Sequence, residues 1–498
     1  MAWPPDPPDG RQAADEASRG SAIKLMAELL GRLIALATTL LVARLLGVAE
    51  FGLFAVLSSV AVIVAEVTDL GIQGIAVQAL VSGTIPLRAL VATKLRLTAV
   101  LLLAVAGLAL VPQGAASLLA ALPGSWRLSL EPMARHLPLL FPLVAYSSLA
   151  GWAELLGLVL RVQGRRVHEA VTIVTLRASG LALAAAALLT GRGLPGLVWA
   201  MALSTLPPVV LAALLLRRTS AGAAHPGAPP DPGMAATLRA SFPLAVNGAL
   251  AILSLRIELL ALAALRGSRE AGLFAAALKV VELVNVVPGA IAAGAMPALT
   301  REAARGGVPV RRRTAATVAL LAAPAFAGVW LVAPGMVLIL GPDYGPAARP
   351  LRVLAPALLA LFMNTVLLHA LVAAGRARRL PVLTALRVAA AALLALALIP
   401  AFGASGAAAG FLASELLLLL LAARACATAG FDVPVLRSLL AALGVTLPMA
   451  AVVAAAGTGP VSSIALGIVI YALTLLAARQ WAPRLLPELA PGDAPGGR

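Results

Sequence analysis

The sequence predicts an all-α integral membrane protein, with about 14 transmembrane helices in two six-helix lobes and two further helices near the C-terminus. Its composition is the first reason: 61% of the residues are hydrophobic and 12% are charged, whereas soluble domains carry about 25% charged residues. Apolar runs of about 18 residues or more recur along the chain, as spanning helices require, and the alternating pattern of a transmembrane β-barrel is absent. A stretch from the first quarter of the chain also recurs in the middle, which indicates an internal duplication.

Each apolar run is long enough to cross a bilayer at about 1.5 Å per residue. The even number of runs places both ends of the chain on the same side of the membrane. The predicted spans cover residues 22–46, 52–79, 88–111, 137–162, 167–191, 194–217, 239–265, 272–299, 314–340, 347–374, 378–400, 405–428, 434–457 and 461–480.

Two pairs of stretches carry the duplication. GLFAVLSSVAVIVAEVTDLGIQGIAVQAL begins at Gly52, and GLFAAALKVVELVNVVPGAIAAGAMPAL begins at Gly272. A second pair begins with Gly-Arg, at positions 164 and 375, and each member carries one arginine inside its span, Arg177 and Arg387. The copies lie six spans apart, so both enter the membrane with the same polarity, which is the parallel type of repeat found in transporters.

Charge sets the predicted orientation. The loops richer in arginine and lysine include 161–166, 311–313 and 376–379, so we expect them, and both termini, to be cytoplasmic. The same rule accounts for the net charge of +17 without a nucleic-acid partner. The predicted parts are a disordered cytoplasmic tail 1–20, an N-lobe 21–217, a cytoplasmic linker 218–238, a C-lobe 239–430, a further pair of spans 431–481 and a short cytoplasmic tail 482–498.

The sequence offers no catalytic constellation, so we do not expect an enzyme. No lysine follows a glycine as in a P-loop, no HExxH motif occurs, and the single cysteine, Cys426, cannot form a disulfide or a metal cluster alone. Accordingly, no metal and no cofactor are predicted.

Charged residues inside the spans are the candidate functional residues, because a charge in a membrane is costly and by default marks a pathway or a partner. In the first span, Glu28 and Arg32 lie four residues apart on one helix face, either as a local ion pair or with Arg32 facing a central cavity. In the second, Glu66 and Asp69 lie three apart, which suits a proton- or cation-linked site, although Asp69 could instead cap the helix near its cytoplasmic end.

The second half of the chain carries its own polar residues. Lys279, Glu282 and Asn285 form a stripe on span eight, and Arg256 and Glu258 on span seven lie two apart, so they need separate partners. Weaker candidates are Glu154, Arg177, Asn247, Asn364, Arg387 and Glu415.

Several motifs resemble one family of transporters. ARLLGVAEFGLFA with the DLG from Asp69 resembles the first two spans of bacterial oligosaccharide flippases. LGPDYGPAARPLRVLAPALL, the Gly-Arg-x-Arg from Gly375, and IPAFGASGAAAG follow in that family's order. Over residues 20–480 the chain thus resembles the Wzx-type O-antigen flippases, the polysaccharide-exporter branch of the multidrug/oligosaccharidyl-lipid/polysaccharide exporter superfamily.

The resemblance implies a function. Members are expected to hold two six-helix lobes around a cationic cavity. They are expected to move a polyprenyl-pyrophosphate-linked oligosaccharide, an O-antigen or exopolysaccharide repeat unit, across the bacterial cytoplasmic (inner) membrane by alternating access. The lipid-linked glycan and membrane lipids are then the partners, with a proton or a sodium ion as coupling ion and a functional link to glycan polymerase machinery. Arg32 and Lys279 fall where members carry basic residues.

These observations combine into a site hypothesis. We expect Arg32, Arg256 and Lys279 to bind the pyrophosphate headgroup, because Arg presents a planar donor fork and Lys a point charge. We expect Glu66, Asp69 or Glu282 to release it by taking up a proton or a cation. A multidrug or cation antiporter of the same superfamily and a membrane glycan polymerase or ligase are the alternatives. The two extra spans argue against the first, and the lack of a large exterior loop argues against the second.

Overall fold

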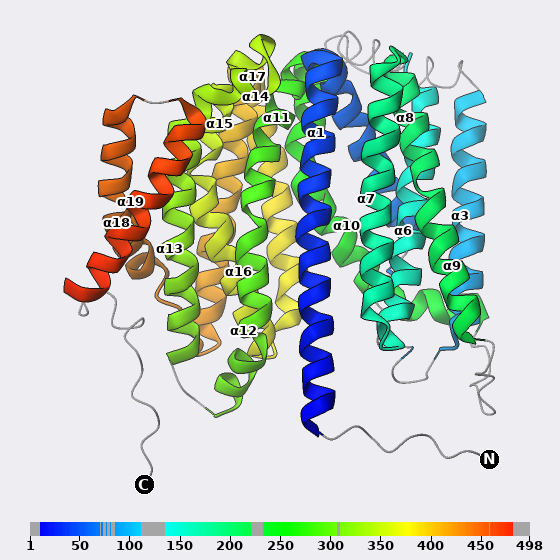
Figure 1. Ribbon diagram of the computed structural model, residues 1–498, viewed down its shortest axis with the longest axis horizontal. Helices are drawn as coiled ribbons and strands as arrows, with labels where there is room; N and C mark the ends of the chain where they lie inside the picture. The colour runs from blue at the N-terminus through cyan, green and yellow to red at the C-terminus, as the bar shows by residue number, and fades with distance from the viewer. Residues whose placement is uncertain are drawn as a thin grey trace. The chain divides into compact units, whose positions relative to one another are not determined.

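The computed structural model describes residues 10–69, 71, 72, 76, 80, 85–110, 135–220, 233–305, 309–457 and 459–481. Within these ranges the regular secondary structure is helical (Figure 1). Residues 111–134, most of the predicted linker 218–238 and the predicted C-terminal tail 482–498 lie outside the described residues. Helix α1 (Gly10–Asp69) begins early, so residues 10–20 are helical where the sequence predicts a disordered tail. Alanine and other good helix formers in this stretch continue the helix.

Long apolar helices dominate the described residues. Ten of them are long and apolar enough to cross a membrane, or up to eleven if a bent pair is one span. The difference from the predicted number of spans has two structural causes: two helices each hold two predicted spans, and the last predicted span corresponds to a shorter apolar helix, Ser462–Ala477. Helix α1 bends at Gly47 (φ 77°, ψ 172°), and α17 (Leu380–Thr428) bends at Gly403 (φ 54°, ψ −132°). The predicted all-helical membrane fold is therefore confirmed.

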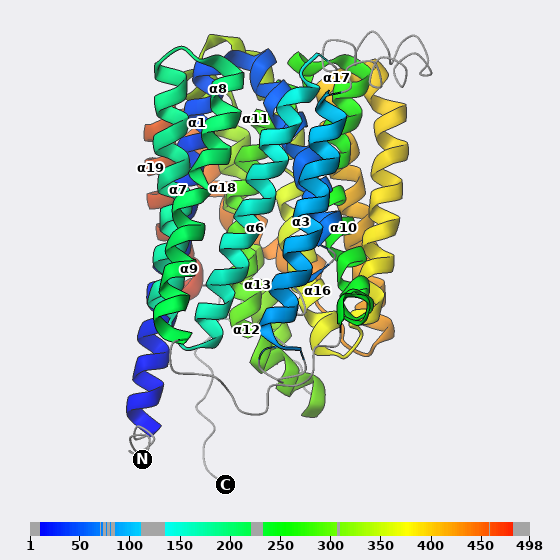
Figure 2. The ribbon, with the colours of Figure 1, turned by 90° about the vertical axis from the view of Figure 1, so that its right-hand side faces the viewer.

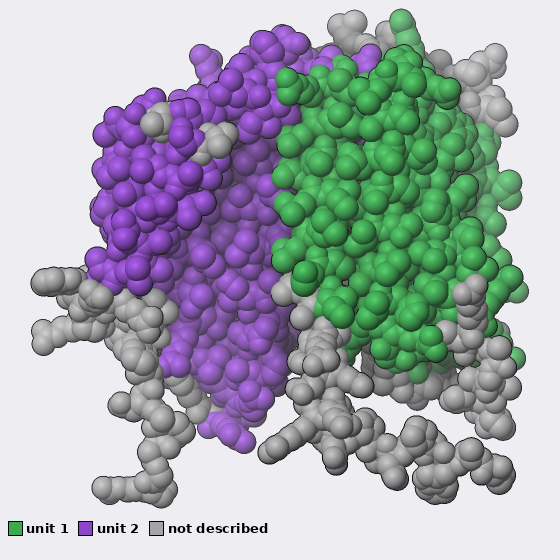
Figure 3. Space-filling view, in the orientation of Figure 1, with its two compact units in different colours: residues 1–46, 57–252 green, residues 47–56, 253–498 purple. Residues whose placement is uncertain are grey.

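The chain divides into two compact units, which are coloured separately in Figure 3. Unit 1 contains residues 1–46 and 57–252, and unit 2 contains residues 47–56 and 253–498. The boundaries predicted for the lobes, linker and terminal pair of spans stay predictions.

Unit 1 is organised around α6 (Leu140–Val162), which packs against α3, α7, α8 and α9 (Figure 2). Its core cluster contains Trp152 and Leu155 of α6 with Leu90 of α3. Proline and glycine set the helix ends, as at the break between α8 and α9 just before Pro207. The other helices are α3 (Leu87–Leu110), α7 (Arg166–Leu189), α8 (Gly193–Ser204), α9 (Leu206–Ser220) and the first part of α10 (Gly233–Arg266), after the 3₁₀ helix η1 (Leu137–Leu139).

Unit 2 is organised around α16 (Ala357–Ala373), which packs against α12, α13 and α17. The last two helices, α18 and α19, pack against α13 (Figure 1), and the Tyr471 hydroxyl donates a hydrogen bond to the Leu320 carbonyl. The remaining elements are α11 (Ser268–Val284), α12 (Val286–Arg305), α13 (Pro309–Val332), η2 (Ala333–Gly335), α14 (Met336–Leu340), η3 (Pro342–Ala347), α15 (Ala348–Leu354), η4 (Ala377–Arg379), α18 (Val435–Ala456) and α19 (Pro460–Trp481).

The duplication is visible in the backbone. Gly47 and Gly267, which occupy matching places before the repeated Gly-Leu-Phe-Ala, share an extended positive-φ conformation (ψ 172° at φ 77°, and ψ −179° at φ 83°) that favours glycine. The helices that follow cross at Gly52 and Gly272. A Cβ on Gly52 would strike the Ser268 carbonyl, and one on Gly272 would strike the Val48 carbonyl. Because these contacts are reciprocal, the repeated glycines allow the two copies of one helix to touch backbone to backbone.

Candidate functional site

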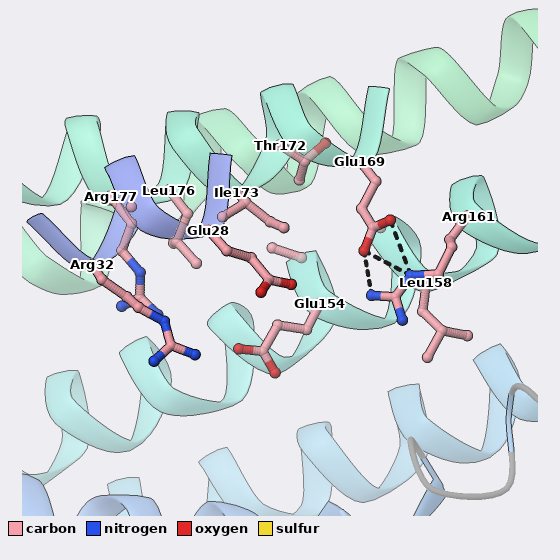
Figure 4. A pocket seen from close by; sticks show the side chains of 13 residues that line it. Glu28, Arg32, Glu154, Leu158, Arg161, Glu169, Thr172, Ile173, Leu176 and Arg177 are labelled. Atoms are coloured by element: carbon pink, nitrogen blue, oxygen red, sulfur yellow. Dashed lines mark hydrogen bonds and ion pairs between the residues drawn. The ribbon is translucent and has the colours of Figure 1, made fainter. Parts of the chain in front are cut away.

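A polar cavity of about 340 Å³ lies in unit 1 between α1, α6 and α7 (Figure 4). Its charged lining is balanced, with three arginines and three glutamates. These are Glu28, Arg32, Glu154, Arg161, Glu169 and Arg177. Such a lining inside apolar helices agrees with the rule that charges in membrane segments face a cavity or the bundle interior.

Arg32 and Arg177 are the two arginines of this cavity that lack a direct carboxylate partner. Neither forms a hydrogen bond or an ion pair among the described residues. The aliphatic stem of Arg177 crosses α1 at Gly31, where a Cβ would lie 3.4 Å from its Cγ. The local Glu28–Arg32 ion pair, one of two readings of the sequence, is therefore not formed. Arg32 instead lines this cavity within unit 1, and its place in a central cavity stays a prediction.

The third arginine closes one end of the cavity. The Arg161 Nε donates to both Glu169 carboxylate oxygens, at 2.8 and 3.0 Å, and its Nη2 contacts the same group. The Glu169 side chain is 3% exposed and the Arg161 side chain is 42% exposed, so the pair stands at a mouth of the cavity (Figure 4). The sequence places Arg161 in a predicted loop and gives no role to Glu169. The turn at Gly164 is the signal that these two residues, which flank it, lie close together.

A second cavity of about 250 Å³ adjoins the first in unit 1. Glu66, Asp69 and Lys94 line it, together with three residues that also line the first cavity, Glu154, Leu176 and Arg177. The predicted acidic pair of span two therefore faces a polar space. The Glu66 carboxylate also packs against Gly248 of α10, where a Cβ would meet its Oε1 at 2.7 Å.

Asp69 forms a buried ion pair with Lys94 of α3. The Lys94 ammonium also lies 5.9 Å from the ring centroid of Trp152, whose Nε1 donates to the Thr98 hydroxyl at 3.1 Å. Lys94 lies two turns into α3, which begins at Leu87, so its ammonium is held among helices. Asp69 is the partner that makes this burial tolerable.

We expect Lys94→Leu to lower the free energy of unfolding by about 1–3 kcal/mol, because the buried Asp69 carboxylate loses its ammonium partner. The double variant Lys94→Leu/Asp69→Asn should recover most of this loss, since it removes both charges. Thermal unfolding of the purified variants measures the effect. A double variant that is as unstable as the sum of the single variants would contradict the pairing.

In unit 2, three of the predicted residues form one cluster. The Glu282 carboxylate accepts from Arg256 Nη1 at 3.3 Å through one oxygen and from Lys279 Nζ at 2.6 Å through the other. All three side chains are partly exposed. Two cations share one carboxylate, so the cluster keeps an excess positive charge.

A second network in unit 2 is fully buried. Arg387 Nε lies 2.7 Å from Glu415 Oε1 and its Nη2 lies 3.9 Å from Glu258 Oε1, while its Nη1 donates to the Ser254 carbonyl. Asn364 Nδ2 donates to Glu415 Oε2 at 2.8 Å. The side chains of Arg387 and Glu258 are 2% and 1% exposed. Arg256 and Glu258 do have separate partners, as their spacing predicts.

The predicted site residues therefore fall into separate groups. Arg256, Lys279 and Glu282 come together in unit 2, and Glu66 and Asp69 line one cavity of unit 1. Arg32 lines the other cavity of unit 1. That Arg32 shares a single headgroup site with Arg256 and Lys279 stays a prediction.

Residues 17–302, more than half of the chain, match the family model of polysaccharide biosynthesis proteins. The chain belongs to this family. No curated protein matches the chain.

Solved structures share the fold of this polysaccharide biosynthesis protein. The lipid II flippase MurJ in an inward closed conformation is 12% identical, with a TM-score of 0.68 over 92% of this chain and 99% of that one. An inward-facing multidrug resistance MATE transporter of the MOP superfamily is 14% identical, with a TM-score of 0.60 over 82% of this chain and 98% of that one. A MOP-superfamily transporter from Pyrococcus furiosus is 15% identical, with a TM-score of 0.55 over 83% and 96%. Family and fold identify a multi-pass membrane protein built like these transporters.

Proposed function

We propose that the protein flips a polyprenyl-diphosphate-linked oligosaccharide, an O-antigen or exopolysaccharide repeat unit, across the bacterial cytoplasmic membrane by alternating access. Both termini then lie in the cytoplasm, and the flipped glycan passes to a polymerase. The family supports a role in polysaccharide biosynthesis, and the fold resembles that of a lipid II flippase. No group transfer is required, because the substrate moves without a bond being formed or broken.

The proposal rests on cationic side chains that belong to apolar helices and yet remain accessible. Arg32 lines a cavity without a direct carboxylate partner, and Arg256 and Lys279 share one partly exposed carboxylate. Accessible cationic side chains within a membrane segment cost free energy and do not stabilise the fold, so they indicate a functional site. A diphosphate supplies negative charge for the cluster of Arg256 and Lys279, and acceptor oxygens for these cations and for the Arg32 guanidinium.

Release needs a competing group, and Glu282 is placed for this role. It already holds both Arg256 and Lys279, so an anionic headgroup at these cations must displace it. In this mechanism Glu282 becomes protonated or binds a cation while the headgroup is held, and it reclaims the two cations when the headgroup leaves. Glu66 and Asp69 provide a second acidic site for a coupling proton or sodium ion.

The test is the double variant Arg32→Ala/Lys279→Ala. We expect glycan export to fall at least tenfold at unchanged protein abundance, because the headgroup loses two cationic contacts, each worth about 1.5 kcal/mol or more. Arg32→Lys should retain part of the activity. Arg313→Ala is the matched control, because Arg313 is exposed on α13 and lies outside both clusters. Normal export by the double variant would show that these cations are structural and overturn the proposal.

A cation-coupled multidrug antiporter is the second candidate. The observations that favour it are the carboxylates Glu28, Glu154 and Glu66 in the cavities of unit 1 and the fold shared with a MATE transporter. Cells that express the protein would then resist cationic drugs and lose this resistance in Glu154→Gln. Glycan export by the same cells with no change in drug resistance would exclude it.

A further inference from the structure

The duplicated halves place one arginine in each copy, in different surroundings. Arg177 and Arg387 are matched by the glycines on either side: Gly164 and Gly375 before them (φ 78° and 70°), and Gly193 and Gly403 after them (φ 57° and 54°). The same spacing that matches the two arginines matches Glu154 with Asn364. One ancestral position has therefore become two distinct sites.

In the second copy, Arg387 is enclosed in a buried ion-pair network. Two carboxylates, Glu258 and Glu415, and the Ser254 carbonyl surround its guanidinium, which has almost no exposed surface. Asn364 donates a hydrogen bond to Glu415 in turn. A guanidinium buried in this way offers no surface to a ligand.

In the first copy, the two carboxylates are missing. The positions that match Glu258 and Glu415 are Thr38 and Thr205, whose hydroxyls donate to their own helix at 2.8 and 2.6 Å. Arg177 therefore lacks the partners that neutralise its counterpart. It lines the 340 Å³ cavity instead, where it and Arg32 extend from facing helices (Figure 4).

Carboxylates line the same cavity as the two arginines. Arg161 is paired with Glu169, and Glu28 and Glu154 also line the cavity. An anion that binds Arg32 and Arg177 therefore lies close to a carboxylate, and a proton on that carboxylate lowers the repulsion between the two negative groups. Arginine keeps its proton at any physiological pH, so the proton taken up with the anion binds a carboxylate.

Glu154 is the carboxylate placed for this exchange, because it lines both cavities of unit 1. Its own helix also contributes Tyr146 and Arg161 to these cavities. The titratable and charged groups that line the two cavities with it from α1, α3 and α7 are Glu28, Arg32, Glu66, Asp69, Lys94, Glu169 and Arg177. A proton can reach Glu154 through the cavity that Glu66 lines, while the anion occupies the cavity that Arg32 lines.

We propose that Arg177 and Arg32 form a diphosphate subsite in unit 1, and that Glu154 takes up one proton when the diphosphate binds. This inference rests on the proposed flippase function and adds Arg177 and Glu154 to it. Two planar guanidinium groups supply paired donors for the diphosphate oxygens. The proton binds a carboxylate oxygen of Glu154 and removes the negative charge of this side chain. Arg177 then binds the diphosphate without competition from that charge.

The experiment uses the purified full-length protein and farnesyl diphosphate, a short prenyl diphosphate, as the probe. Calorimetry in two buffers of different ionisation enthalpy gives both the affinity and the number of protons taken up. We expect proton uptake by the wild type and at least tenfold weaker binding by Arg177→Gln, with partial recovery in Arg177→Lys. We expect Glu154→Gln to bind without proton uptake. Arg313→Gln should match the wild type.

The outcomes distinguish the proposed flippase function from the proposed diphosphate subsite. No binding of farnesyl diphosphate by the wild type would remove the proposed function itself. Wild-type binding that Arg177→Gln leaves unchanged, or proton uptake that persists in Glu154→Gln, would overturn the subsite alone. Should Arg177→Gln lose its fold in thermal unfolding, Arg177→Lys decides, because it keeps the charge: an unchanged affinity overturns the planar two-arginine subsite.

Discussion

Replacing Arg387 with leucine will remove most of the folded protein from the membrane. The substitution leaves Glu258 and Glu415 buried without the guanidinium that is the cation of both ion pairs. Breaking a buried pair by removal of one partner costs about 3–5 kcal/mol, and here one arginine serves two carboxylates. A loss of this size is a large fraction of the stability of an ordinary protein domain, about 5–15 kcal/mol. The abundance of a fluorescent fusion in detergent-solubilised membranes and its unfolding temperature measure the effect.

Two further variants make this expectation specific. Arg387→Leu/Glu258→Gln/Glu415→Gln should recover much of the lost abundance, because it removes all three charges together. Arg378→Leu, an exposed change at the start of the same helical segment, should behave as the wild type. Normal abundance of Arg387→Leu would contradict the description of Arg387 as the neutralising centre of this network.

Gly272→Ala will also destabilise the protein, by about 3 kcal/mol or more. A Cβ at Gly272 would strike the Val48 carbonyl, and a Cβ at Gly52 would strike the Ser268 carbonyl. Overpacking costs about 1–3 kcal/mol where side chains can rearrange, and a backbone carbonyl has less freedom to move. We expect Gly52→Ala to have the same effect, because the crossing is reciprocal. The unfolding temperature in detergent is the measurement.

The matched control is Gly294→Ala in α12. No atom lies within 4 Å of a Cβ at Gly294, so the change should be neutral or slightly stabilising, as alanine favours a helix. The double variant Gly52→Ala/Gly272→Ala should cost less than the sum of the single variants, since one separation of the helices relieves both clashes. Equal stability of Gly272→Ala and Gly294→Ala would refute the close crossing.

Much of the fold follows from the sequence because the bilayer imposes strict requirements. A spanning segment must be long, apolar and internally hydrogen-bonded, so the apolar runs locate the helices to within a few residues. The duplicated Gly-Leu-Phe-Ala also predicts equivalent backbones, and Gly47 and Gly267 share one conformation. Even the separate partners of Arg256 and Glu258 follow from the helical period.

Partners on other helices were much harder to predict. The rotation of α3 against α1 brings Lys94 to Asp69, and nothing in either segment alone fixes this rotation. The pairing of Arg387 with Glu258 and Glu415 joins residues far apart in sequence, so spacing arguments do not reach it. Glu28 and Arg32 show the same limit, because helical spacing permits an ion pair but does not decide whether it forms, and both side chains line a cavity without pairing with each other.

The central claim is that the protein flips a lipid-linked glycan, and reconstitution tests it most directly. The purified protein is placed in liposomes that carry a polyprenyl-diphosphate-linked oligosaccharide, and an impermeant enzyme or lectin reports the glycan that appears on the opposite leaflet. We expect transfer by the wild type, at least tenfold slower transfer by Arg32→Ala/Lys279→Ala, and wild-type rates for Arg313→Ala. Transfer that does not exceed that of protein-free liposomes, from protein whose fold is verified by its unfolding temperature, would contradict the proposed function.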